Sequence, residues 1–86
     1  MLQIRLGIVI PQGWRNDLPQ TSASYQFKYS KDMVVAAERN GFDSVYAYDH
    51  FIPHYRYPRA GSFFECFTLL SAISLYTNKL KIGQIV

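Results

Sequence analysis

Three apolar segments that alternate with two helix-forming segments constrain the fold of this chain more than any other feature. Residues 3–10, 42–48 and 80–86 are rich in β-branched and aromatic side chains and predict strands. Residues 25–40 and 63–76 have the composition and apolar spacing of helices. Strands that are joined by helices of this length form a parallel sheet through right-handed crossovers, so the sequence predicts an α/β fold of order β-α-β-α-β.

Turn and capping residues set the expected limits of these elements. Pro11 lacks an N–H group and stops the first strand, which we expect to be buried. Gly41 stands at the C′ position of the first helix, where a left-handed conformation is common. Ser62 and Glu65 match a capping box at the start of the second helix. The stretch 11–24 predicts a long surface loop, long enough to be functional.

Two parallel architectures compete for this order of elements. A doubly wound nucleotide-binding sheet usually carries G-x-G-x-x-G after its first strand, whereas residues 11–16 read Pro-Gln-Gly-Trp-Arg-Asn. The sequence therefore favours the start of a (β/α)8 TIM barrel. Such a barrel needs about 250 residues, so we expect these 86 residues to be the N-terminal portion of a single incomplete barrel domain. Its first and third strands would be open edges.

Composition argues against several classes of protein. A hydrophobic fraction of 49% and an aromatic fraction of 16% indicate a folded chain. The net charge is +3, but the basic residues are scattered, so we expect no nucleic-acid partner. No segment approaches the roughly 18 to 20 apolar residues of a membrane span. The single cysteine, Cys66, cannot form an intrachain disulfide and is expected to pack a helix in a cytoplasmic protein.

The pair Asp49 and His50 follows the second predicted strand and is the best candidate for chemistry. In parallel barrels, the reacting groups cluster on the loops after the strands. An ordinary loop, in which Asp49 binds backbone amides, would explain the same residue types. His50 and His54 have the spacing of a helical zinc pair, but Pro53 between them opposes a helix, so we expect no metal site.

Other candidates have structural explanations of equal weight or better. Glu65 is either a general acid or base or part of the capping box, and the capping box favours the second reading. Four aromatic residues in the loops would either line a pocket for a planar ring or pack locally. They are Trp14, Phe51, Tyr55 and Tyr57.

Three blocks of the sequence carry a resemblance to a known family. Residues 41–51 (GFDSVYAYDHF), 64–73 (FECFTLLSAI) and 77–84 (TNKLKIGQ) resemble, in order and spacing, the N-terminal third of luciferase-like oxidoreductases. Residues 6–8 and 11–15 are similar to the subgroup that depends on the deazaflavin coenzyme F420. Enzymes that use flavin mononucleotide (FMN) share the three blocks. Phe67 after Cys66 departs from the tryptophan that is commoner in the family.

The resemblance implies an activity and a set of site residues. The expected activity is hydride transfer between coenzyme F420 and a small organic substrate; the alternatives are an FMN-dependent monooxygenase of the same fold and an inert truncated fragment. Asp49 and His50 would be catalytic, with His50 carrying the proton. The cofactor would lie against Asp49, His50, Gln84, Ile85 and Val86, and the substrate pocket would include Gln12, Trp14 and Phe51. The family also implies a non-proline cis peptide at residues 85–86 and allows a homodimer of the full-length form.

Overall fold

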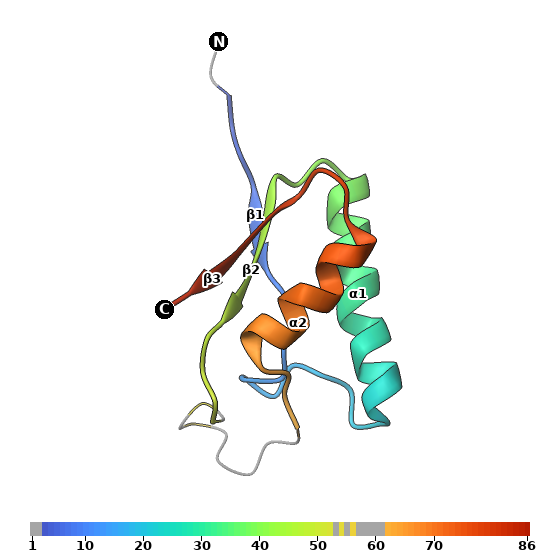
Figure 1. Cartoon of the computed structure of the whole chain (residues 1–86), viewed down its shortest axis with the longest axis vertical. Helices are drawn as coiled ribbons and strands as arrows, with labels where there is room; N and C mark the ends of the chain where they lie inside the picture. Colours follow the sequence, from blue (N-terminus) through green and yellow to red (C-terminus); the bar gives the residue numbers. More distant parts are fainter. Residues whose placement is uncertain (1–2, 53, 55, 57–61) are drawn as a thin grey trace.

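The computed structural model describes residues 3–52, 54, 56 and 62–86 and has the expected order of strands and helices (Figure 1). Pro53, Tyr55 and Tyr57 lie outside the described residues. The elements are β1 (Gly7–Val9), α1 (Ala23–Arg39), β2 (Ser44–Tyr48), α2 (Cys66–Ile73), the 3-10 helix η1 (Ser74–Tyr76) and β3 (Lys81–Ile85).

Within the described residues, the strands form a parallel sheet of order β1-β2-β3, and α1 and α2 pack on the same face of it (Figure 1). Ile8, Val45 and Ile82 are in register and face the helices, where the core also includes Val34 of α1 and Leu69 of α2. The α/β class and the parallel sheet are therefore confirmed. Closure into a barrel involves strands beyond β3 and stays a prediction.

The other face of the sheet carries one large ring between two glycines. Val9 and Gly83 are the register partners of Tyr46, and Gly7 precedes Val9 by two residues, so all of them share this face. A Cβ atom built on Gly7 would lie 3.0 Å from the Tyr46 ring and 2.6 Å from Ser44 Oγ. A Cβ atom on Gly83 would lie 3.0 Å from the same ring. The ring of Tyr46 therefore extends over both neighbouring strands, in space that their missing side chains leave.

The first strand is shorter and more exposed than the sequence predicted. The backbone of residues 6–10 does follow β2, since Leu6 O accepts from Asp43 N at 2.8 Å and Ile10 N donates to Tyr46 O at 2.8 Å. Ile4 is nevertheless 79% exposed. The prediction of a buried strand was wrong for this segment because β1 is an edge of the described sheet; Ile10 after its end is fully buried, and Ile8 packs against the core while only partly buried.

The ends of α1 are close to those expected. The helix begins at Ala23, two residues earlier than predicted, because the Ser22 hydroxyl accepts from Tyr25 N at 3.3 Å and makes Ser22 the N-cap. It ends at Arg39, and Gly41 follows with φ of 86°, as its C′ position predicted. No helix of the described chain has the length and apolar character needed to cross a membrane.

The predicted capping box at the start of α2 was wrong. Glu65 is itself the N-cap: its carboxylate accepts from Phe67 N at 2.8 Å and from Thr68 N at 3.0 Å. Ser62 instead donates its hydroxyl to Gln26 Oε1 on α1, at 3.0 Å. The segment before Glu65 therefore stays outside the helix, and α2 begins at Cys66.

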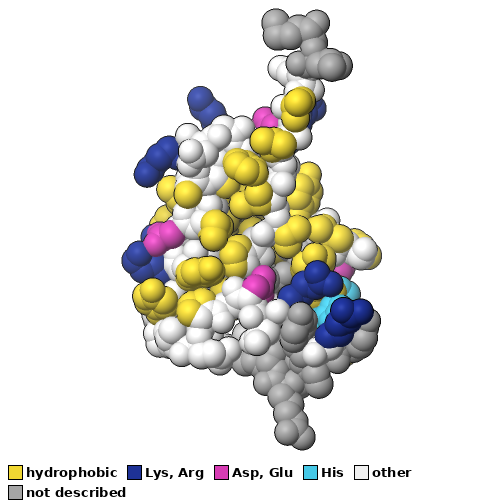
Figure 2. Space-filling view, turned by 180° about the vertical axis from the view of Figure 1, so that it is seen from behind, with side chains coloured by type: hydrophobic (Ala, Val, Ile, Leu, Met, Phe, Trp, Pro, Cys, Tyr) yellow, Lys and Arg dark blue, Asp and Glu magenta, His cyan; other side chains and the backbone are white. Residues whose placement is uncertain are grey.

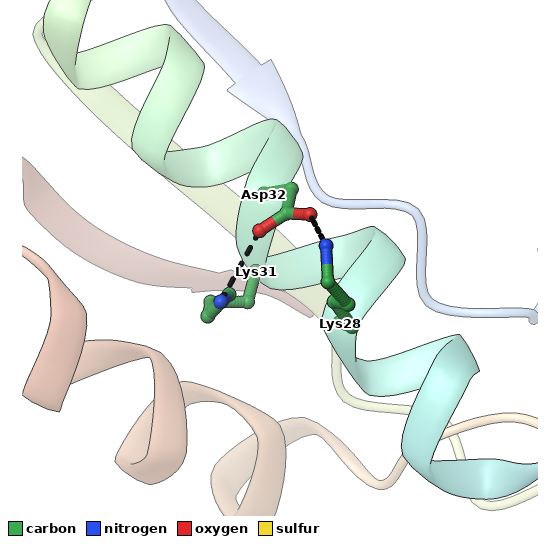
Figure 3. A network of polar contacts seen from close by, with 3 residues as sticks. All are labelled: Lys28, Lys31 and Asp32. Atoms are coloured by element: carbon green, nitrogen blue, oxygen red, sulfur yellow. Dashed lines mark hydrogen bonds and ion pairs between the residues drawn. The ribbon is translucent and has the colours of Figure 1, made fainter.

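Two carboxylates of α1 play contrasting parts. Glu38 Oε2 accepts from the backbone N–H groups of residues 78, 79 and 80 at 2.9, 2.7 and 3.0 Å, which joins α1 to the turn before β3. These N–H groups lower the pKa of Glu38. Asp32 pairs with Lys28 at 2.5 Å and with Lys31 at 3.2 Å on the exposed side of the same helix (Figure 3). Exposed pairs of this kind contribute little to stability.

Candidate functional site

The carboxyl ends of β2 and β3 meet at one edge of the sheet. Tyr48 is in register with Ile85, and Asp49 N donates to Ile85 O at 3.2 Å. The structure therefore brings Asp49 and His50 next to the end of β3, as parallel pairing requires. The cis peptide implied for residues 85–86 is absent, since the described residues contain no cis peptide bond.

An aromatic cluster of Trp14, Tyr48, His50 and His54 lies at this edge. The ring of Trp14 stacks on the imidazole of His50, with centroids 4.1 Å apart and planes 11° apart. Tyr48 is tilted against Trp14 at 4.4 Å, and His54 meets the indole edge-on at 4.8 Å. His50 is half-buried, so the stack orients its ring and leaves part of it accessible.

A tight turn after β1 positions Trp14. Asp17 Oδ1 accepts from Gly13 N at 2.7 Å, and Asn16 N donates to Gly13 O at 3.0 Å. Gly13 has φ of 96°, and a Cβ atom there would lie 2.7 Å from Ser62 O and from Phe63 Cβ. Glycine is therefore needed both for the turn and for the close approach of the loop that precedes α2.

Gln12 joins the same loops from inside the protein. Its side chain is 1% exposed; Nε2 donates to Tyr48 O and to Phe64 O, both at 2.8 Å, and Oε1 accepts from Tyr48 N at 2.9 Å. Both amide hydrogens and the amide oxygen are thus bound to backbone groups. The resemblance implied a position in the substrate pocket, but the structure makes Gln12 a buried brace between the end of β2 and the entry to α2.

His54 belongs to the cluster, although the sequence suggested it only as an unfavoured metal ligand. Its backbone N donates to Trp14 O at 3.1 Å, and its Nδ1 accepts from Arg56 N at 3.1 Å. Burial lowers the pKa of His54, and the positive charges of Arg15 and Arg56 lower it further. Among the described residues, no group of three or more potential ligands gathers in a way that could hold a metal ion.

Cys66 and Glu65 occupy structural positions beside the site. The Cys66 thiol is buried and donates to Ala47 O at 3.6 Å; burial, with the nearby carboxylates of Glu65 and Asp49, raises its pKa. This is the packing role that the sequence predicted. The Thr68 hydroxyl and the first amides of α2 lower the pKa of Glu65, and both of its carboxylate oxygens accept hydrogen bonds. A helix cap accounts for Glu65 without a role in acid–base chemistry.

Four further predicted site residues differ in their exposure and in the face of the sheet that they occupy. Phe51 is 78% exposed, and Val86 is 93% exposed. Gln84 is in register with the buried Ala47, so it is on the helix-covered face, where it lines a groove with Phe67 and Leu70 of α2. Ile85 is half-buried and shares the opposite face with Tyr46. Gln84 and Ile85 therefore occupy opposite faces of the sheet, and contact of either residue with a cofactor stays a prediction.

Comparison with known proteins gives two matches. The sequence profile of the family described as luciferase-like monooxygenase matches residues 4–86. The chain is also 32% identical over 85 residues to the N-acetyl-S-(2-succino)cysteine monooxygenase of Bacillus subtilis (strain 168). That alignment covers 91% of this chain and 19% of the relative, so the chain spans about a fifth of the length of the relative.

Proposed function

Since the chain belongs to the luciferase-like monooxygenase family, we propose that it is part of an oxidoreductase in which His50 transfers a proton beside a bound redox cofactor. The observation that carries this proposal is the stack of His50 on Trp14 at the carboxyl end of β2. Imidazole changes its charge near neutral pH and is the commonest general acid or base.

The residues at this edge fit a planar cofactor. Trp14 holds one face of the His50 ring, and Asp49 N is fixed by Ile85 O, so the loop after β2 presents the imidazole on rigid supports. When bound, a deazaflavin supplies a hydride, whereas a flavin also activates oxygen. His50 would exchange the accompanying proton with the substrate, and Asp49 would act as a positioning residue for the loop.

We propose further that the described strands are the first three of a (β/α)8 barrel. Sequential parallel order with the helices on one face is the arrangement that such a barrel requires. The face that carries Tyr46 between Gly7 and Gly83 would then line the barrel interior. A small organic molecule would be the substrate, and the full-length form would be able to form a homodimer.

The proposed cofactor is coenzyme F420. The support is the resemblance of residues 11–15 to F420-dependent relatives. This segment contains Trp14, the residue that stacks on His50. The second candidate is an FMN-dependent monooxygenase, which the name of the Bacillus subtilis relative favours.

Titration separates the two cofactors. The complete protein should bind coenzyme F420 more tightly than FMN when each is followed by its fluorescence, and Trp14→Ala should lower turnover by removing the support of His50. Tighter binding of FMN, together with NADH-supported oxygen uptake, would assign the protein to the monooxygenases. Failure to bind either cofactor would favour an inert fragment.

A further inference from the structure

Positive charge gathers around the ring of Trp14. Arg15 Cζ lies 5.8 Å from the centroid of that ring, on whose surface His50 and His54 also pack. Arg56 follows His54 closely, with its backbone N donating to His54 Nδ1 at 3.1 Å, and the charges of Arg15 and Arg56 both lower the pKa of His54. Figure 2 shows Lys or Arg side chains lying directly against histidine at one end of the molecule. We call Arg15, Arg56, His50 and His54 the basic cluster.

The carboxylate nearest to Arg15 in the sequence is engaged within the turn after β1. Asp17 Oδ1 accepts from Gly13 N there at 2.7 Å. In the described part of the chain, Arg15 has no ion pair, and its contact is with the indole of Trp14. The charge of its exposed guanidinium is therefore not balanced by a protein carboxylate.

This arrangement suits an anionic ligand. Like charges that are held close together repel, and an anion bound among them relieves the repulsion. A guanidinium that packs its face against an aromatic ring keeps its N–H edge for the two oxygens of a carboxylate or phosphate. Trp14 is thus in contact with both Arg15 and His50, the group proposed to transfer the proton.

We propose that the basic cluster is a binding site for an oxyanion, a carboxylate or phosphate group of the ligand whose reaction His50 serves. The role of this site as a subsite for a substrate or cofactor rests on the proposed function. The affinity of the site for simple anions is independent of that function. Arg15 supplies the paired N–H donors, and the guanidinium of Arg56 supplies further positive charge.

Isothermal titration calorimetry of the complete protein with succinate and with inorganic phosphate tests the site. Both anions should bind, uncharged succinamide should not, and the affinities should fall as ionic strength rises. Arg15→Gln should weaken both anions about tenfold or more, because a charge-assisted pair is lost. Arg15→Lys should give an intermediate loss of affinity, since lysine keeps the positive charge but lacks the paired N–H donors of the guanidinium. Arg39→Gln, an exposed change at the end of α1, should leave both affinities unchanged.

Competition identifies the source of the oxyanion. If the site takes a cofactor phosphate, FMN should displace succinate and riboflavin should not. If it takes a substrate carboxylate, succinate should bind the cofactor-loaded and free proteins equally. Absence of saturable binding of both anions, or full binding by a folded Arg15→Gln variant, would overturn the site. Cofactor binding without anion binding rejects this inference alone, and anion binding without cofactor binding rejects the proposed function alone.

Discussion

At the end of β2, the ring of Trp14 fixes the ring of His50, and this contact sets the first prediction. His50→Ala in the complete enzyme should lower kcat by about 10² to 10⁴, the usual contribution of a general acid or base. Cofactor affinity should change much less, because the backbone at residues 49 and 85 stays in place. Steady-state kinetics and a cofactor titration measure the two effects.

The neighbouring Ile52 provides the control. It is 72% exposed, so Ile52→Ala should leave kcat unchanged although it alters the same loop. Full turnover by His50→Ala, with a substrate deuterium isotope effect showing that chemistry limits the rate, would remove His50 from the mechanism.

Single residues differ in how far the sequence could define their roles. The positions of Asp49 and His50 followed from the end of the predicted strand, and Trp14 was already a candidate. The roles of Gln12 and Gln84 were harder to define from the sequence, because an amide side chain suits a buried brace, a groove or a ligand site equally well. Only the register of β3 against β2 and the burial of Gln12 decide between these roles. Glu65 was predicted as part of a capping box with Ser62, but Ser62 donates to Gln26 and Glu65 is itself the N-cap, a tertiary contact that local sequence does not reveal.

Between elements, Glu38 of α1 joins the turn before β3 through three hydrogen bonds to one carboxylate oxygen. Glu38→Gln should lower the melting temperature and the hydrogen-exchange protection of the amides of residues 78–80, because a charged acceptor of three N–H groups is lost. Asp32→Asn should have a smaller effect, since it removes only the exposed pairs of Figure 3.

The pH dependence of the Glu38 effect has a definite sign. The pKa of Glu38 is lowered in the folded protein, so its contribution is full above about pH 4.3, the ordinary pKa of glutamate, and is lost as the pH falls through the folded value. The difference in melting temperature between wild type and Glu38→Gln should therefore be constant near neutral pH and shrink in acid. An equal difference at neutral pH and well below the folded pKa would contradict this account.

The ring of Tyr46 couples the three strands, which a double-mutant cycle can measure. Gly83→Ala should destabilise the protein by about 1 to 3 kcal/mol, because its Cβ would lie 3.0 Å from that ring. Tyr46→Ala should abolish this cost in the double variant. Denaturant unfolding gives the four free energies.

Gly41→Ala separates crowding from backbone strain. A Cβ atom at Gly41 meets nothing within 4 Å, but its φ of 86° is unfavourable for alanine. Its cost should persist in the Tyr46→Ala background. If the Gly83→Ala cost also persisted there, the ring of Tyr46 would not be its cause.

The sequence pattern predicted the order and type of the helices and strands more accurately than it predicted their first and last residues. The signals at Pro11 and Gly41 are local, and both held. The extent of β1 depends on its partner: β2 begins at Ser44, so the residues before Leu6 have no strand to follow, although their composition is that of a strand.

For the whole molecule, the uncovered edges and apolar surface predict association of the isolated chain. Val9 of β1 and the preceding Ile4 and Leu6 are exposed, and hydrophobic side chains spread over the middle of the face in Figure 2. The 86-residue chain alone should sediment as oligomers or aggregates in analytical ultracentrifugation.

A charged residue on the edge should reduce this association. Leu6→Lys places a charge immediately before β1, whereas Leu75→Lys places the same charge on η1, at a side chain that is 81% exposed. Only the first should shift the chain toward monomer. A wild-type monomer that melts cooperatively would show that the three described strands suffice as a domain.

At this scale, the order of elements and the parallel sheet were predictable because helical crossovers allow few alternatives. Barrel closure and the choice between F420 and FMN were not settled by the same argument. Closure depends on how β1 and β3 are covered, and both cofactors are planar rings that the cluster of Trp14 and His50 would accept in similar ways.

The side chain of Gln12 has a consequence for the time course of folding. It joins backbone groups that lie 36 and 52 positions further along the chain, so its bonds cannot form until both β-α units have been brought together. Contacts between such distant residues form slowly, because the intervening chain must first be ordered. The edge that carries His50 should consequently be among the last parts of the chain to reach its native form, after α1 and the helix-facing core.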